Sequence, residues 1–378
     1  MHNNSGLSFT ECEEVSLDQS LFLNKKSKLY ESTENLYKVL GGLLQVINLK
    51  KDKYNYGFMD RDINDLSNFY SCISDMINNQ NFIYWVKLYK DNKQTKVDLI
   101  RTPKKINDVI DNITKDKPVI LTSATMRSNT PTSPNNSGYN AIKNRLDLSN
   151  RTGIIEATPK LSPFDYRNNT LLYYDTTLPS PTDKKVLHRD YLHNLTMKID
   201  ELINISNGRS LVLFTNKKDM MMVYNYLSGI NNYPFDIYYH DDNNSIINKF
   251  KQNTNSVLLS ASLWEGIDIP GESLSQVIIT RLPFPVSDAV SDYYASGLKS
   301  NEAYNQVIYP AMISKFKQGI GRLIRSETDY GVYSILDSRI NRDLDTIVAN
   351  LPGKSPITSD IRQVNKFFNQ KNNVKSLK

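Results

Sequence analysis

The most informative stretches of this sequence are SASLWEGIDIPG (Ser260–Gly271) and QGIGRLIRS (Gln318–Ser326). In the second stretch, Gln318, Arg322 and Arg325 have the spacing i, i+4 and i+7, so one helix would place an amide and two guanidinium groups along one stripe. A guanidinium fork matches phosphate oxygens and keeps its charge. The pattern therefore indicates a surface that holds a phosphate, with a solvated basic helix face as the simpler alternative.

Two glycines in the same expected helix strengthen this interpretation. Gly319 and Gly321 each cost a helix about 1 kcal/mol relative to alanine, which indicates that another group approaches the backbone closely. Ile320, Leu323 and Ile324 lie on the other side of the helix and would face a core. A basic surface helix alone explains neither the glycines nor this apolar face.

The first stretch is typical of a strand followed by a loop. Val257–Leu259 is a short apolar run of the kind found in parallel strands covered on both faces. Ligands of open α/β sheets bind beyond the carboxyl ends of the strands, where this loop would lie. Glu265, Gly266 and Asp268 would then line the site, with the two acids suited to a ribose hydroxyl or a water near a metal. An ordinary turn with solvated acids, and a core position for Trp264, is the alternative.

Composition sets broad limits on the class of protein. A chain of 378 residues with 39% hydrophobic residues predicts two domains, or three, with substantial cores. The net charge of +6 permits a polyanionic partner without demonstrating one. Cys12 and Cys72 are the only cysteines, so this chain alone builds neither a disulfide framework nor a four-cysteine iron–sulfur cluster. The start lacks a basic and apolar signal sequence, and no apolar run approaches about 20 residues, so we expect a soluble cytoplasmic protein with no membrane partner.

The second half of the sequence alternates between strands and helices, which predicts an α/β fold with a parallel, doubly wound sheet. The expected strands are Ser210–Phe214, Phe235–Tyr239, Ser256–Leu259, Gln276–Thr280 and Val332–Leu336, and the expected helices are Val186–Ile205 and Ser245–Lys251. From Asp343 the tail is expected to form amphipathic turns with Ile361, Val364, Phe367 and Phe368 on one face.

The first half is more helical and ends in irregular sequence. Met1–Ser27 is polar and without period, and we expect it to be at most partly ordered. Two amphipathic helices, a β-hairpin, a short helix and a buried strand should follow, with a loop between the two long helices and a linker after the strand. The expected segments are helices around Leu36–Ile47 and Leu66–Ile77, the loop Lys50–Phe58, strands Phe82–Tyr89 and Thr95–Ile100, the helix around Ile106–Ile113, the strand Pro118–Thr122 and the linker Arg127–Thr152.

Candidate nucleic-acid contacts follow two of these strands. Thr215, Asn216 and Lys217 come directly after the strand Ser210–Phe214, where they could contact a sugar-phosphate chain without reading its sequence. The alternative is a helix cap followed by a basic first turn. Small hydroxyl residues in TSATM (Thr122–Met126) could hydrogen-bond to a phosphate or to an acidic loop.

In their order and separation, the two opening stretches resemble motifs V and VI of superfamily 2 helicases, specifically the DinG and XPD group of ATP-dependent DNA helicases. The segments VIITRLPFPVSD (Val277–Asp288) and DYGVYSILDSRI (Asp329–Ile340) resemble the same group. TSATM resembles motif III, and NGRSLVLFTNKKD (Asn207–Asp219) resembles motif IV. The resemblance extends from about Asn81 to Phe368, about three quarters of the chain.

The resemblance implies a RecA-like motor domain that hydrolyses ATP in a cleft between two such domains and steps along single-stranded DNA. Arg322 and Arg325 would reach the γ-phosphate, and Gln318 would help to position it. Glu265, Gly266, Asp268 and Gly321 would line the nucleotide. Contacts to DNA would come from Thr125, Thr215, Asn216, Lys217, Trp264 and Arg281.

Two motifs that the family needs are not found in the sequence, namely the glycine-rich phosphate loop and the Asp-Glu pair for Mg²⁺. The Gly-Lys-Ser at Gly353–Ser355 is rejected because Val348 stands at the first glycine position and prolines flank it. We therefore expect the C-terminal part of such a helicase, with the metal ligands outside this chain, no metal site of its own and negligible ATPase activity alone.

In this interpretation, residues 1–80 form a helical arch-like or partial first motor region, 81–150 the end of motor domain one with a linker, and 151–378 motor domain two. The expected partners are ATP, single-stranded DNA and an N-terminal motor half. A non-catalytic single-strand-binding module and an inactive remnant of a helicase remain as alternatives.

Overall fold

The computed structural model describes residues 12–17, 24–54, 60–78, 81–91, 94–115, 117–123, 125–127, 138–158, 162–230, 232–241, 244–266, 269 and 271–376. The chain divides into two compact units. The hairpin unit comprises Met1–Ile120, Asn144–Asn150 and Val286–Ala303, and the sheet unit comprises Leu121–Lys143, Arg151–Pro285 and Tyr304–Lys378. The division into domains at residues 80 and 150 remains a prediction.

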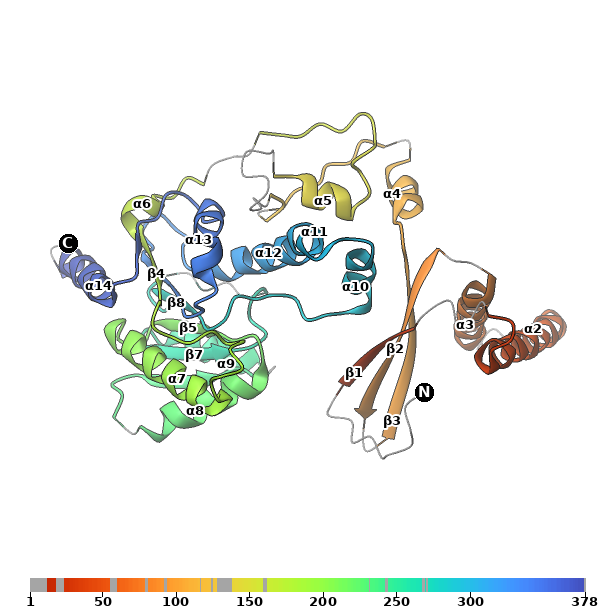
Figure 1. Ribbon diagram of the computed structural model, residues 1–378, viewed down its shortest axis with the longest axis horizontal. Helices are drawn as coiled ribbons and strands as arrows, with labels where there is room; N and C mark the ends of the chain where they lie inside the picture. The colour runs from red at the N-terminus through yellow and green to blue at the C-terminus, as the bar shows by residue number, and fades with distance from the viewer. Residues whose placement is uncertain are drawn as a thin grey trace. The chain divides into compact units, whose positions relative to one another are not determined.

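The sheet unit is built on seven strands in the order β10-β4-β9-β8-β5-β7-β6 (Figure 1). Every neighbouring pair is parallel, which confirms the predicted RecA-like α/β fold. The sequence patterns had missed β4 and β10, which are the first and last of these strands along the chain. The strands are β4 (Thr170–Tyr174), β5 (Ser210–Leu213), β6 (Asp236–Tyr239), β7 (Ser256–Ser260), β8 (Gln276–Ile279), β9 (Gly331–Ile335) and β10 (Ile357–Thr358).

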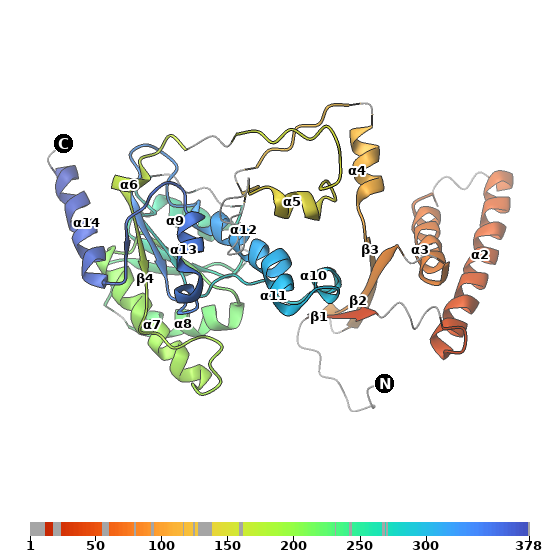
Figure 2. The same cartoon turned by 45° about the horizontal axis from the view of Figure 1, so that its top comes forward.

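Helices cover both faces of this sheet, which is why its strands are continuous apolar runs. Val212 packs into one core, and its neighbours Leu211 and Leu213 pack into the other. The first core is closed by α7, α8 and α14, and the second by α9, α12 and α13 (Figure 2). The helices are α7 (His188–Ile205), α8 (Lys217–Gly229), α9 (Asn244–Gln252), α12 (Tyr309–Ile320), α13 (Ile340–Ala349) and α14 (Ile361–Ser376), with the one-turn α6 (Tyr166–Asn169) and the π-helical turn η2 (Tyr304–Ile308) beside them.

The strand order reverses direction at β5. From β5 the chain moves outward to β6 and returns to β7, and it then crosses to β8 and β9 on the other side. Loops that follow the carboxyl ends of β5, β7 and β8 therefore meet at one edge, where open α/β sheets bind their ligands.

The hairpin unit has its own core. Helix α2 packs against α3, and α3 packs on β2 of the sheet β1-β2-β3; Leu40, Ile73, Met76 and Tyr84 are buried in this core. The two predicted helices and the hairpin are confirmed, whereas the strand β1 was not expected from the polar start. The elements are β1 (Cys12–Leu17), α2 (Lys28–Tyr54), α3 (Asp60–Asn78), β2 (Phe82–Asp91), β3 (Gln94–Pro103), α4 (Asn107–Thr114), α10 (Ala289–Ser296) and α11 (Ser300–Ala303), and α5 (Asn140–Arg145) lies in segments of both units.

Three predicted segments were wrong. Pro118–Thr122 is not a strand, and Ile120 is 88% exposed, because neither described sheet pairs with this segment. The loop predicted at Lys50–Phe58 is helical as far as Tyr54, since α2 continues through its lysines. The linker predicted at Arg127–Thr152 contains the short helix α5.

The described part of the chain contains no helix both long and apolar enough to cross a membrane.

Candidate functional site

Trp264 ties together the loops at the edge of the sheet where the strand order reverses. Its ring nitrogen Nε1 donates a 2.8 Å hydrogen bond to the carbonyl oxygen of Phe214, which directly follows β5. Thr280, which follows β8, donates from Oγ1 to the carbonyl oxygen of Leu213 at 3.0 Å. The loops after β5, β7 and β8 are therefore held at fixed positions around one edge.

The helix that was predicted to carry Gln318, Arg322 and Arg325 on one stripe ends too early. α12 stops at Ile320, and Gly321 caps it by donating from its backbone nitrogen to the Lys317 carbonyl at 2.9 Å. Only Gln318 lies within the helix, so the prediction of a single stripe was wrong. The spacing i, i+4 and i+7 is compatible with a helix but does not by itself make one.

The group that approaches the helix backbone is the ring of Trp264. A Cβ atom placed on Gly319 would lie 3.0 Å from the ring and 3.1 Å from Leu213. The glycine was correctly interpreted as a sign of close approach, but the neighbour is a buried side chain. Trp264 is only 2% exposed, so a nucleic-acid base cannot stack on its ring in this arrangement.

Arg322 nevertheless reaches the loop that carries the acidic residues. Its Nη2 donates a 3.2 Å hydrogen bond to the carbonyl oxygen of Trp264, directly before Glu265. Glu265 and Gly266 are exposed. Gly266 has a φ of +78°, and no atom of the described residues lies within 4 Å of its Cβ position. Asp268 lies outside the described residues.

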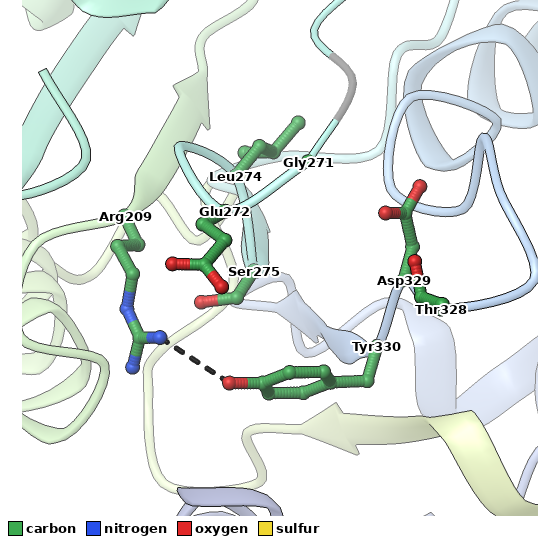
Figure 3. Close-up of a pocket in the computed structure, with 8 residues that line it drawn as sticks. All are labelled: Arg209, Gly271, Glu272, Leu274, Ser275, Thr328, Asp329 and Tyr330. Atoms are coloured by element: carbon green, nitrogen blue, oxygen red, sulfur yellow. Dashed lines mark hydrogen bonds between the residues drawn. The ribbon is translucent and has the colours of Figure 1, made fainter. Parts of the chain in front are cut away.

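Arg325 is exposed in the turn that follows α12, and Asp329 holds the backbone of this turn in place. Asp329 Oδ2 accepts hydrogen bonds from the backbone nitrogens of Arg325 and Ser326, each at 2.8 Å. The next residue, Tyr330, is also held in place, because its hydroxyl accepts a 3.3 Å hydrogen bond from Arg209 Nη1 (Figure 3). Asp329, Tyr330 and Arg209 line a cavity of about 110 Å³ at the amino ends of β5, β8 and β9, away from the loops at the carboxyl ends.

Lys317 was not identified from the sequence. Its Nζ donates a 2.7 Å hydrogen bond to the carbonyl oxygen of Arg127. Burial, followed by the positive charge of Arg127, lowers the pKa of Lys317 to about 8. A cation is thus held one residue before Gln318 in α12. Nothing in the local sequence distinguishes it from a solvated lysine.

On the side predicted to bind nucleic acid, Asn216 proves to be a helix cap. Its Oδ1 accepts a 2.7 Å hydrogen bond from the backbone nitrogen of Asp219, and its Nδ2 donates to Asp219 Oδ2 at 2.8 Å. Thr215 and Lys217 flank it and are exposed. The alternative of a helix cap therefore describes the Asn216 side chain, while Thr215 and Lys217 remain accessible.

Arg281 faces inward. Its Nη2 lies 2.9 Å from Asp219 Oδ2, and its guanidinium carbon lies 4.8 Å from the centre of the Tyr191 ring. Its side chain is 18% exposed. Thr125 is half-buried, and its backbone nitrogen donates to Ser123 Oγ at 3.2 Å. The structure thus brings Arg281 to Asn216 through Asp219, a residue that the sequence analysis did not select.

No group of three or more His, Cys, Asp or Glu side chains that could hold a metal ion occurs among the described residues. Among the described residues at this edge, Arg322, Arg325, Gln318 and Glu265 offer groups that suit phosphate oxygens and a ribose.

The sheet is parallel, and the loops after β5, β7 and β8 are hydrogen-bonded together where the strand order reverses. The sheet unit is therefore a RecA-like α/β domain. Residues 199–356 match the model of the helicase C-terminal domain family. The chain is 32% identical to the ATP-dependent DNA helicase YoaA of Haemophilus influenzae over 232 residues, which are 58% of this chain and 35% of that protein. It is 34% identical to the probable ATP-dependent helicase YpvA of Bacillus subtilis over 194 residues, 50% of this chain and 28% of that protein.

The chain therefore spans about a third of the length of the curated relatives it matches. Among solved structures, it is similar to S. tokodaii Xpd4 with a TM-score of 0.54 and 16% identity, over 93% of this chain and 62% of that one. A structure described as XPD_APO matches with a TM-score of 0.53 and 18% identity, over 83% and 61%. These structures support the fold. Together, the comparisons confirm the resemblance to the C-terminal portion of a DinG/XPD-type superfamily 2 helicase.

Proposed function

We propose that this chain is the second motor domain of an ATP-dependent DNA helicase, together with a part of the first, and that it couples ATP hydrolysis to movement along single-stranded DNA. One observation carries the proposal: the Arg322 guanidinium rests on the loop of Glu265, with the exposed Arg325 on the next turn. Arginines placed beside a transferring phosphoryl group stabilise its charge in the transition state. We expect the protein to act in the cytoplasm.

The nucleotide side is assigned to the loops around Trp264. Arg322 and Arg325 would contact the γ-phosphate, with Gln318 positioning it from the last turn of α12. Glu265, Gly266, Asp268 and Gly321 would border the nucleotide. ATP supplies the phosphoanhydride bond whose cleavage drives the cycle, and the chain's own contribution is to bind and orient the terminal phosphate.

The phosphate loop and the ligands of Mg²⁺ would come from the rest of a first motor domain, outside these 378 residues. The greater length of the relatives supports this. The chain alone should therefore bind nucleotide weakly and turn it over slowly.

Single-stranded DNA is assigned to the adjacent loop after β5. Thr215, Lys217 and the backbone around Asn216 would contact phosphates and sugars, and Thr125 would contribute from the segment of motif III. Because Trp264 and Arg281 are turned inward, their contribution would be to hold these loops in place.

ATPase measurements test the nucleotide side. We expect turnover below about one per second for the chain alone, and restored turnover when it is joined to the first motor domain of a relative such as YoaA. Arg325→Ala should then lower the restored rate about a thousandfold. Arg362→Ala is the control, because Arg362 is exposed and paired with Asp360. Ordinary turnover by the chain alone, lost in Arg325→Ala, would show that a phosphate cradle lies within it.

A non-catalytic single-strand-binding module is the second candidate. It is favoured by the hydrogen bond of Arg322 to the Trp264 carbonyl, which gives this arginine a structural role. Oligonucleotide binding that responds neither to ATP nor to Arg322→Ala would support this module over the motor.

A further inference from the structure

A single buried carboxylate joins three elements at the edge of the sheet. Asp219 Oδ1 lies 2.9 Å from His188 Nε2 at the start of α7. Its Oδ2 lies 2.9 Å from Arg281 Nη2, after β8, and 2.8 Å from Asn216 Nδ2, before α8. Asp219 is 4% exposed, so this carboxylate depends on its partners for the solvation that it has lost. The starts of α7 and α8 are therefore held at a fixed separation.

The partners of Asp219 divide into an inner and an outer group. Arg281 lies inside, between the carboxylate and the Tyr191 ring, so its charge is largely neutralised there. The His188 side chain is 57% exposed. An ionised carboxylate only accepts hydrogen bonds, so Nε2 of His188 carries the proton in this contact and the rest of the ring faces outward. Asp219 thus fixes the orientation of one surface imidazole.

Exposed cations lie at or near the starts of both helices. Lys217 and Lys218 begin α8, while Lys184, Lys185 and Arg189 lie before and within the first turn of α7. The Arg189 side chain is 83% exposed.

Few carboxylates oppose these cations. Asp190 lies 3.4 Å from Arg189 Nε, and Asp183 Oδ1 accepts a hydrogen bond from the backbone nitrogen of Lys185 at 2.9 Å. With Asp219 already paired to Arg281, the exposed part of this surface keeps a net positive charge. The segment carrying Lys184 and Lys185 is also fixed in place, because Val186 packs against the core under α7 and α8.

We propose that the start of α7, from Lys184 to Arg189, continues the contact surface of Lys217 and Lys218 and binds phosphates of single-stranded DNA. Asp219 is its positioning residue. This inference rests on the proposed function, since it extends the DNA contact assigned to the loop after β5. A group of exposed cations near two helix starts suits a flexible phosphodiester chain, whose phosphates are contacted one at a time.

Fluorescence anisotropy of a labelled 20-nucleotide oligo(dT), measured over a series of KCl concentrations, tests the surface. The double variant Lys185→Ala/Arg189→Ala should bind about tenfold more weakly than the unmodified chain. Because each lost phosphate contact lowers the salt slope by about 0.7 for a single strand, the slope should fall by about 1.4. The control is Lys354→Ala, since Lys354 is exposed but precedes β10 at the amino end of the sheet. It should stay within about twofold of the unmodified chain.

The outcomes separate this inference from the proposed function. If Lys217→Ala weakens binding but the double variant binds normally with an unchanged slope, the α7 surface is excluded and the loop after β5 still binds DNA. If the unmodified chain shows no salt-dependent binding, both the inference and the DNA-binding part of the proposed function are wrong.

Asp219→Asn tests the positioning role. Removing a negative charge from a DNA-binding surface should by charge alone strengthen binding, whereas loss of the positioning contact should weaken it several-fold. Weaker binding with an almost unchanged salt slope would therefore support positioning, and tighter binding would overturn it. His188→Ala provides a second variant if Asp219→Asn does not fold. It removes one partner and leaves the Arg281 pair intact, and normal binding by this variant would exclude His188 from the surface.

Discussion

At the scale of the residue, Lys317 shows how a side chain with no sequence signature can acquire an unusual property. Its Nζ is held against the Arg127 carbonyl, and burial together with the Arg127 charge lowers its pKa from 10.5 to about 8. The unfolded chain therefore binds more protons than the folded chain between about pH 8 and 10.5. The contribution of Lys317 to the free energy of unfolding must rise with pH across this range.

We compare the free energy of unfolding of Lys317→Met with that of the unmodified chain. The difference, variant minus unmodified, should be more positive at pH 7 than at pH 9.5. At pH 7 the variant avoids burying an ammonium group. At pH 9.5 Lys317 of the unmodified chain is already mostly neutral in the folded state, so the variant gains less. Urea unfolding at the two pH values measures the difference. Lys317→Arg, which stays charged at both values, should lose stability relative to the unmodified chain as the pH rises. Equal differences at both pH values would contradict the lowered pKa.

Asp219 illustrates the same limit of sequence reasoning. An acidic residue in the first turn of a helix is expected from the helix dipole alone, so it attracts no attention. Its role depends on Arg281 and His188, which are distant in the sequence and meet Asp219 only in the folded chain. The candidates Thr215, Asn216 and Lys217 were correctly placed after β5, but their relation to Arg281 depends on tertiary structure.

At the scale of the element, α12 shows what a local pattern can and cannot predict. The predicted helices Val186–Ile205 and Ser245–Lys251 correspond to α7 and α9, and apolar runs located five of the seven strands of the sheet unit. Short edge strands such as β10, with two residues, leave too weak a pattern. The end of α12 at Ile320 was missed because the spacing of Arg322 and Arg325 remains helical beyond it, whereas Gly321 caps the helix.

The contact between α12 and Trp264 leads to a prediction about Gly319. Alanine there gains up to about 1 kcal/mol of helix propensity but places a Cβ atom 3.0 Å from a ring that is already fixed by its bond to Phe214. Overpacking of this kind costs about 1–3 kcal/mol. Gly319→Ala should therefore lower the free energy of unfolding by about 1 kcal/mol, measured by urea denaturation.

Gly229 offers a matched control in the same unit. It is the last residue of α8, and no atom in the described part of the chain lies within 4 Å of its Cβ position. Gly229→Ala should be neutral, or should stabilise by up to about 1 kcal/mol. If both alanine variants behave alike, the Trp264 ring yields to the added methyl group and the close approach has no energetic meaning.

At the scale of the whole molecule, the two compact units have separate cores of unequal size. The hairpin unit buries one cluster around Leu40, Ile73 and Tyr84, whereas the sheet unit buries a large cluster on each face of its sheet. Because burial of apolar surface is the main stabilising contribution, the sheet unit should be the more stable of the two. Unfolding with two transitions is therefore expected for the intact chain.

The sequence contains two tryptophans, and each reports on one unit. Trp85 lies in β2 of the hairpin unit, and Trp264 lies in the core of the sheet unit. In Trp264→Phe the remaining fluorescence follows the hairpin unit, and in Trp85→Phe it follows the sheet unit. We expect the signal of Trp85 to change at the lower urea concentration and with the smaller slope, since a smaller surface is exposed. Coincident midpoints and slopes, in both variants and in circular dichroism, would instead mean that the two cores unfold as one cooperative structure.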